Sequence, residues 1–113
     1  MNARPSRPPA WAVLQRALTE RRPVRVRYPG NERILCPPAL GWKNGRPKVL
    51  AYQAGGATSQ GPLPDDPQQR WRSMFIDEVE DAMIAEGLWA WETADNYSPT
   101  SNCIDELDIA IGD

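Results

Sequence analysis

The dipeptide Asn44-Gly45 most constrains the fold of this chain, because Asn-Gly is the strongest short signal for a tight hairpin turn. The residues on both sides have the character of strands, over residues 39–42 before the turn and residues 48–53 after it. Upstream, residues 24–28 alternate apolar and basic side chains with the period of two expected of a half-buried strand. No helical segment separates these strands, so the sequence predicts an antiparallel sheet.

The remaining segments predict one helix and further short strands. Trp11, Leu14 and Leu18 form one apolar stripe of a helix expected over residues 10–20, which Pro23 ends. The prolines of Pro37-Pro38 interrupt the strand that begins at Glu32, which indicates an edge strand or a bend. The other expected elements are a loop over residues 54–69, a strand over 71–77, a strand or helix over 79–85, and a last strand over 104–111.

These elements predict an α+β fold that is mainly β. We expect a small antiparallel barrel with an N-terminal helix over residues 10–85, preceded by a flexible basic arm, residues 1–9. Residues 86–113 form an acidic, Trp-containing C-terminal extension.

Composition excludes several classes of site. The chain has 113 residues, 41% of them hydrophobic and 25% charged, which fits one globular domain without a membrane span. Histidine is absent, so His-based triads and His-ligated metals are excluded. Cys36 and Cys103 are too few for a zinc site or a disulfide framework. We therefore expect no cofactor, no metal and a reducing, cytoplasmic setting.

Charge is divided unequally along the chain. Residues 1–50 hold eleven Lys and Arg against two Asp and Glu, whereas residues 51–113 hold two against thirteen. This asymmetry indicates a charged partner, or one half of the chain folding against the other. A hypothesis that follows is that the acidic C-terminal segment lies over a basic face and competes there with a polyanion.

The order of these segments resembles the WYL domain family over about residues 14–85. The similar segments are residues 18–28, residues 32–37 with Gly41-Trp42, residues 45–52, and residues 71–79 with Phe75, Asp77 and Val79. Three positions depart from the family pattern: Lys48 and Val49 replace the Trp and Tyr of the namesake triplet, of which only Leu50 remains, and Glu78 stands where arginine is usual.

The resemblance implies a fold and a function. WYL domains are Sm-like, SH3-type β-barrels that serve as sensory modules of bacterial regulators, often in phage defence or DNA-damage responses. They bind nucleic acid or nucleotide-like ligands through basic barrel residues. The resemblance therefore implies a stand-alone, non-enzymatic module of transcription regulation.

Seven side chains are candidates for an anion site. Guanidinium groups bind phosphate oxygens bidentately, and aromatic rings stack on bases. We predict phosphate contacts by the arginines of the predicted strands and stacking by two rings near them: Arg25, Arg27, Arg33, Arg46, Arg72, Trp42 and Tyr52. The alternative is that the charges form a solvated face and the rings belong to the core.

A second functional class is a protein–protein interaction or assembly module with no small ligand. Trp89 and Trp91 lie beyond the presumed barrel, where they either pack back on it or form a partner surface or homodimer contact. Catalysis is not expected, because no histidine is present to activate Cys36 as a nucleophile.

Overall fold

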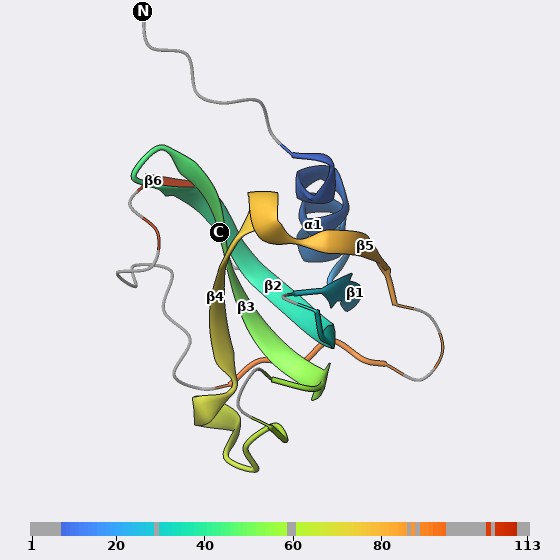
Figure 1. The fold of residues 1–113 in the computed structure, drawn as a ribbon. Helices are drawn as coiled ribbons and strands as arrows, with labels where there is room; N and C mark the ends of the chain where they lie inside the picture. Colours follow the sequence, from blue (N-terminus) through green and yellow to red (C-terminus); the bar gives the residue numbers. More distant parts are fainter. Residues whose placement is uncertain are drawn as a thin grey trace, which may run out of the picture.

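A computed structural model describes residues 8–28, 30–58, 61–85, 87, 89–94, 104 and 106–110 (Figure 1). Its elements, in chain order, are the helix α1 (Pro9–Glu20), the strands β1 (Val24–Arg27), β2 (Glu32–Lys43) and β3 (Arg46–Gly56), the 3-10 turn η1 (Pro67–Gln69), β4 (Trp71–Phe75), the 3-10 turn η2 (Ile76–Glu78), β5 (Glu80–Ile84) and β6 (Glu106–Ala110). Residues 1–7 of the predicted basic arm, and Cys103, lie outside the described residues.

The helix α1 is confirmed and begins one residue earlier than predicted, at Pro9. Proline is tolerated in a first turn, because its missing N–H has no partner there in any case. The apolar stripe of the helix is buried, and the chain leaves it at Arg21, which adopts a left-handed conformation with φ of 51°. The N–H of Arg22 then donates to the carbonyl of Ala17 at 2.9 Å, which closes the last turn.

The strands form one antiparallel sheet in the order β4-β3-β2-β1-β5, with β6 paired to β2. The predicted hairpin is confirmed, and both of its turn residues, Asn44 and Gly45, have positive φ. The segment that was ambiguous between strand and helix is the strand β5. The fourth strand ends at Phe75, two residues before its predicted end, because the chain then turns through η2.

Strand β2 is the central strand of the sheet. Along one edge, residues 32–35 pair with β1 and residues 39–42 pair with β6, while the opposite edge pairs with β3. Pro37 and Pro38 fall between the two partners, where the register with β3 also shifts. The edge-strand interpretation of these prolines is therefore wrong. Two residues without N–H groups are accommodated because they lie at an irregularity and not within a regular ladder.

The sheet is strongly curled. Strands β4 and β5 occupy opposite ends of the strand order, yet only residues 76–79 connect them. In a flat sheet, four strand spacings of about 4.8 Å would separate these strands by roughly 19 Å, too far for a short connection that contains a 3-10 turn. No described ladder joins β4 to β5, so a closed barrel is not shown. The antiparallel, mainly β architecture with one N-terminal helix is confirmed.

The helix packs on the inner, concave face of the sheet, chiefly against β2 and β5. There it buries Trp11 and Leu14 against core side chains such as Val24, Leu35 and Met74. The C-terminal extension joins the same sheet through β6, which pairs with β2. The predicted last strand is thereby confirmed. Among the described residues, no helix has the length and apolar character needed to cross a bilayer.

Candidate anion site and surface groove

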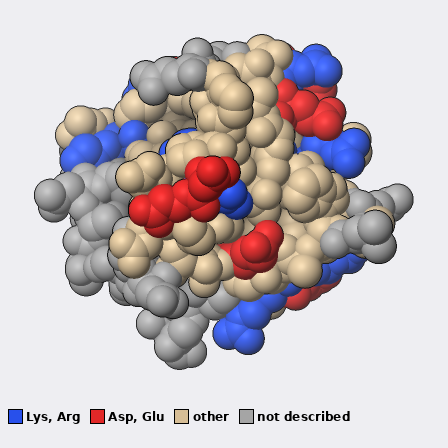
Figure 2. Space-filling view, turned by 90° about the horizontal axis from the view of Figure 1, so that it is seen from below, with Lys and Arg blue, Asp and Glu red and all other residues tan. Residues whose placement is uncertain are grey.

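The arginines of β1 are paired with carboxylates. Nη1 of Arg25 lies 3.9 Å from Oε1 of Glu32, and Nη1 of Arg27 lies 3.1 Å from Oδ2 of Asp81. On the face shown in Figure 2, Lys and Arg side chains occupy separate places with Asp and Glu among them. The β1 arginines therefore do not contribute unpaired charge to a common basic patch.

Arg46, at the start of β3, is paired more extensively. Its Nη2 donates to Oδ1 of Asp77 at 2.8 Å and to Oε2 of Glu78 at 3.1 Å, and its Nε donates to Oδ2 of Asp77 at 3.3 Å. These hydrogen bonds, with Asp77 first, raise the pKa of Arg46. The guanidinium also lies over the ring of Phe75, 3.7 Å from its centroid. Glu78, which stands where the WYL pattern usually has arginine, therefore forms an internal ion pair with Arg46.

The two aromatic side chains predicted to stack on a ligand are buried instead. Trp42 is 3% exposed and stacks on Trp11, with ring centroids 5.3 Å apart. Tyr52 is 2% exposed and meets Trp71 edge to face at 5.6 Å. Both rings belong to the packed interior, which was the alternative interpretation, and neither offers a face to a base.

Arg33 differs from the other predicted arginines, because it is buried without a counter-ion. It lies two residues before the core residue Leu35, on the same inner face of β2, and is 4% exposed. Its Nε has no hydrogen-bond partner, and no described carboxylate pairs with it. The guanidinium carbon lies 5.5 Å from the centroid of the Tyr28 ring. Burial, and next the charge of Arg72, lower the pKa of Arg33.

Arg72 reaches the same end of the inner face from β4. Its Nε donates to Oε1 of Gln53 at 3.2 Å, and its Nη1 donates to the carbonyl of Gln69 at 3.0 Å. Gln53 is fully buried, and its Nε2 donates to the carbonyls of Gly55 and Ala57, each at 3.0 Å. The amide of Gln53 is therefore fixed with its oxygen toward Arg72. Nη1 of Arg72 also donates to the carbonyl of Trp71 at 2.8 Å, and its Nη2 has no acceptor among the described residues.

We name Arg33, Gln53 and Arg72 the inner-end cluster. The sequence predicted both arginines, although as members of a larger patch, and it missed Gln53. A signal for Gln53 was present: Val49, Ala51 and Gln53 alternate toward the core in β3, and a glutamine at the third position is a polar residue where an apolar one is expected. The cluster combines two positive charges, a fixed amide and no described carboxylate.

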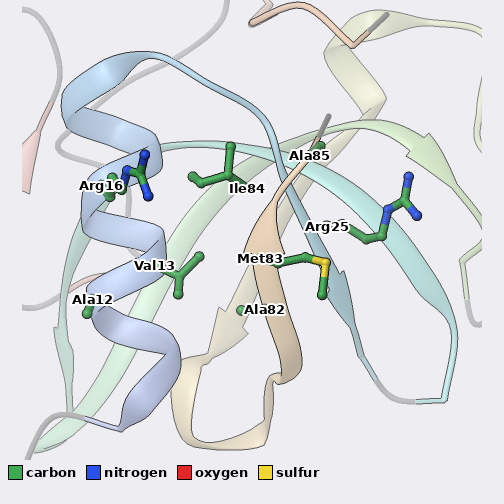
Figure 3. Close-up of a pocket in the computed structure, with 8 residues that line it drawn as sticks. All are labelled: Ala12, Val13, Arg16, Arg25, Ala82, Met83, Ile84 and Ala85. Carbon is green, nitrogen blue, oxygen red and sulfur yellow. The ribbon is translucent and has the colours of Figure 1, made fainter. Parts of the chain in front are cut away.

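A groove between α1 and β5 is a second candidate place for binding (Figure 3). It has a volume of about 740 Å³, and its lining is mainly apolar, with two arginines: Ala12, Val13, Arg16, Arg25, Ala82, Met83, Ile84 and Ala85. Val13 and Ile84 lie between the helix and the strand, and Met83 is 57% exposed. Apolar walls of this kind suit contact with another protein better than they suit an isolated anion.

The two tryptophans predicted as a partner surface lie on the other side of the sheet. Trp91 is partly buried beside Cys36 and Tyr52, so it packs back on the sheet. The Trp89 ring lies against Gly55, where a Cβ would clash with it, yet 40% of Trp89 stays exposed.

Cys36 lies beneath this extension as a buried thiol. The backbone N–H of Glu92 donates to its Sγ at 3.4 Å, and burial raises the pKa of Cys36 to about 11. A neutral thiol is a poor nucleophile. The described part of the chain contains no group of three or more His, Cys, Asp or Glu side chains placed to hold a metal ion.

Comparison with protein-family models, with curated proteins and with solved structures found no match to this chain. The WYL resemblance therefore stays a prediction, and the site is judged from its own contacts.

Proposed function

We propose that this protein is a non-enzymatic module that binds a nucleotide-like anionic ligand at the inner-end cluster. The observation that carries the proposal is the state of Arg33, which is 4% exposed, has a buried Nε without a hydrogen-bond partner and forms no ion pair with the described residues. An anion that accepts hydrogen bonds from Arg33 and Arg72 supplies the negative charge and the acceptors that the described residues do not give Arg33.

Energetics support a binding role for Arg33. Leaving a buried charge uncompensated destabilises a protein by about 3–5 kcal/mol. A cation–π contact such as that with Tyr28 offsets only part of this, about 2 kcal/mol. The fold therefore includes a group that disfavours it, and proteins break the rules of stable folding in this way at functional sites.

A single ligand group at this cluster fits the contacts better than a nucleic acid spread over a basic face. Arg25, Arg27 and Arg46 already bind carboxylates, so the polyanion version of the prediction loses three of its five cations. The finer assignments, an Sm-like barrel and a sensory role like that of WYL domains, belong to this proposal. The curled sheet supports the first of them.

Assembly with another protein is the second candidate function. It is favoured by the groove between α1 and β5 and by the exposure of Met83 beside it. A role in assembly is compatible with an anion site, because the groove and the inner-end cluster share no lining residue.

Isothermal titration of the full chain with a mononucleotide, and with a short single-stranded oligonucleotide at two salt concentrations, tests the proposal. We expect binding that is lost in Arg33→Gln and in Arg72→Gln and retained in Arg22→Gln, which removes an equal charge from an exposed side chain just after α1. Failure of all these anions to bind contradicts the proposed function. Binding that survives both cluster variants places the site elsewhere.

A further inference from the structure

We infer that the inner-end cluster accepts one terminal phosphoryl group, as in a phosphate monoester or free phosphate, and discriminates against the internal phosphodiesters of a nucleic-acid strand. This inference rests on the proposed function and specifies its ligand class.

The N–H donors of the cluster that have no acceptor in the described part of the protein determine how many oxygens of a ligand it can bind. No described residue accepts a hydrogen bond from the guanidinium of Arg33, and Nη2 of Arg72 has no described acceptor. A guanidinium presents its N–H groups as a planar fork that matches two oxygens of one phosphate. The fork of Arg33 and the Nη2 of Arg72 together suit a group with three unsubstituted oxygens, which a monoester has and a diester lacks.

Charge favours the same group. A phosphate monoester carries about −1.5 to −2 at neutral pH, because its second pKa is near 6, whereas a diester carries a single negative charge. The cluster holds two guanidinium charges and, within the described part of the chain, no carboxylate that pairs with either. A dianion therefore neutralises the pair, whereas a monoanion leaves one of the two positive charges uncompensated.

Burial limits the shape of the ligand. Arg33 is only 4% exposed, so a phosphate must project inward to meet it. A terminal phosphoryl group projects from its ligand, whereas an internal diester is flanked by a sugar on both sides. Arg25, Arg27 and Arg46 are engaged by carboxylates, so these three predicted cations are not available to the next phosphates of a strand.

The experiment compares ligands that share a base but differ at phosphorus. Isothermal titration of the full chain uses adenosine 5′-monophosphate, its 3′,5′-cyclic diester, inorganic phosphate, and a twelve-nucleotide DNA without terminal phosphates. We expect the monoester to bind at least about tenfold more tightly than the cyclic diester, the equivalent of one lost charge-assisted hydrogen bond. Arg33→Gln and Arg72→Gln remove that preference, and Arg22→Gln, outside both the cluster and the groove, keeps it.

The outcomes separate this inference from the proposed function. If the cyclic diester or the DNA binds as tightly as the monoester through Arg33 and Arg72, the proposed function holds and the inference fails. If no anion binds, the proposed function fails as well. Circular dichroism verifies that each variant is folded, and the partly exposed Arg72 provides a second variant should Arg33→Gln unfold the chain.

Discussion

Trp42 stacks on Trp11, with ring centroids 5.3 Å apart and 26° between the ring planes, and so joins the central strand β2 to the helix α1. Both side chains are almost fully buried, at 3% and 2% exposure. The pair therefore works as a packing contact between the two layers of the fold.

Replacement of Trp42 with alanine tests this assignment. Truncating a buried tryptophan destabilises a protein by about 3–5 kcal/mol, so Trp42→Ala should lower the free energy of unfolding by that amount in urea titrations. Trp42→Phe keeps an aromatic partner for Trp11 and should lose much less. If Trp42→Ala keeps its stability but no longer binds mononucleotide, the Trp42 ring belongs to the ligand site and the packing assignment is wrong.

Gly41 is required by the close approach of β6. A Cβ at this position would clash with the carbonyl oxygen of Glu106 and lie 2.6 Å from a side-chain carbon of Ile104. Gly41→Ala should therefore destabilise the protein by about 1–3 kcal/mol and loosen β6, seen as faster amide exchange over residues 106–110. Gly45→Ala is the comparison: no atom lies near its Cβ, so only the strain of its φ of 76° applies and exchange in β6 stays slow.

Arg33→Met should raise the stability of the protein and abolish its binding of phosphate. The substitution keeps a long side chain and removes the buried charge, so we expect the ligand-free protein to gain on the order of 1 to 3 kcal/mol. Thermal unfolding without and with phosphate measures both effects: the variant should melt higher than the native chain, and phosphate should no longer raise its melting temperature. A variant less stable than the native chain would mean that Arg33 has a structural role.

Carboxylates that now pair with arginines should suppress binding to nucleic acid. Asp77→Asn with Glu78→Gln releases Arg46, and Asp81→Asn releases Arg27. Each released cation should steepen the dependence of DNA affinity on salt by a slope of about 0.7 for a single strand. The measurement is fluorescence anisotropy with labelled single-stranded DNA between 50 and 200 mM salt. An unchanged slope would show that these ion pairs do not control the surface charge.

Alkaline pH should destabilise the fold through Cys36. Burial raises the pKa of Cys36 from 9.0 to about 11, so the folded state holds the thiol proton more tightly than the unfolded state does. The resulting stability is complete below pH 9 and is lost as pH rises toward about 11. The loss is on the order of 2 kcal/mol, and Cys36→Ala lacks it. Urea unfolding of both proteins at pH 8 and pH 10.5 compares them, and equal losses would contradict the prediction.

Local patterns were sufficient to predict most of the fold. The apolar stripe of α1, the alternation in β1 and the Asn44-Gly45 turn each depend on neighbouring residues, and each is confirmed. The closeness of β4 and β5 was not evident in the sequence, because it follows from the curvature of the whole sheet. Of the two interpretations of Pro37-Pro38, the bend agrees with the irregular register there, and the edge strand was excluded only by the central place of β2 in the sheet.

The candidate site was predicted only in part, for an electrostatic reason. Arg25, Arg27 and Arg33 look alike in the sequence, all near or within short strands of the basic half. What distinguishes them is whether a carboxylate from a later segment reaches them, as Asp81 reaches Arg27. The split of charge between the two halves of the chain thus marks internal pairing at several positions, supplied largely by η2 and β5. The C-terminal segment of the original hypothesis does not provide these three pairings.

The arrangement of β1 and β6 along a single edge of β2 has a consequence during synthesis. While the chain leaves the ribosome, β1 can meet β2 early, but the stretch that includes Leu40 keeps its hydrogen-bonding groups unsatisfied on one side until β6 has emerged. A nascent chain stalled before Glu106 would therefore present an open, apolar strand edge to chaperones and to other nascent chains.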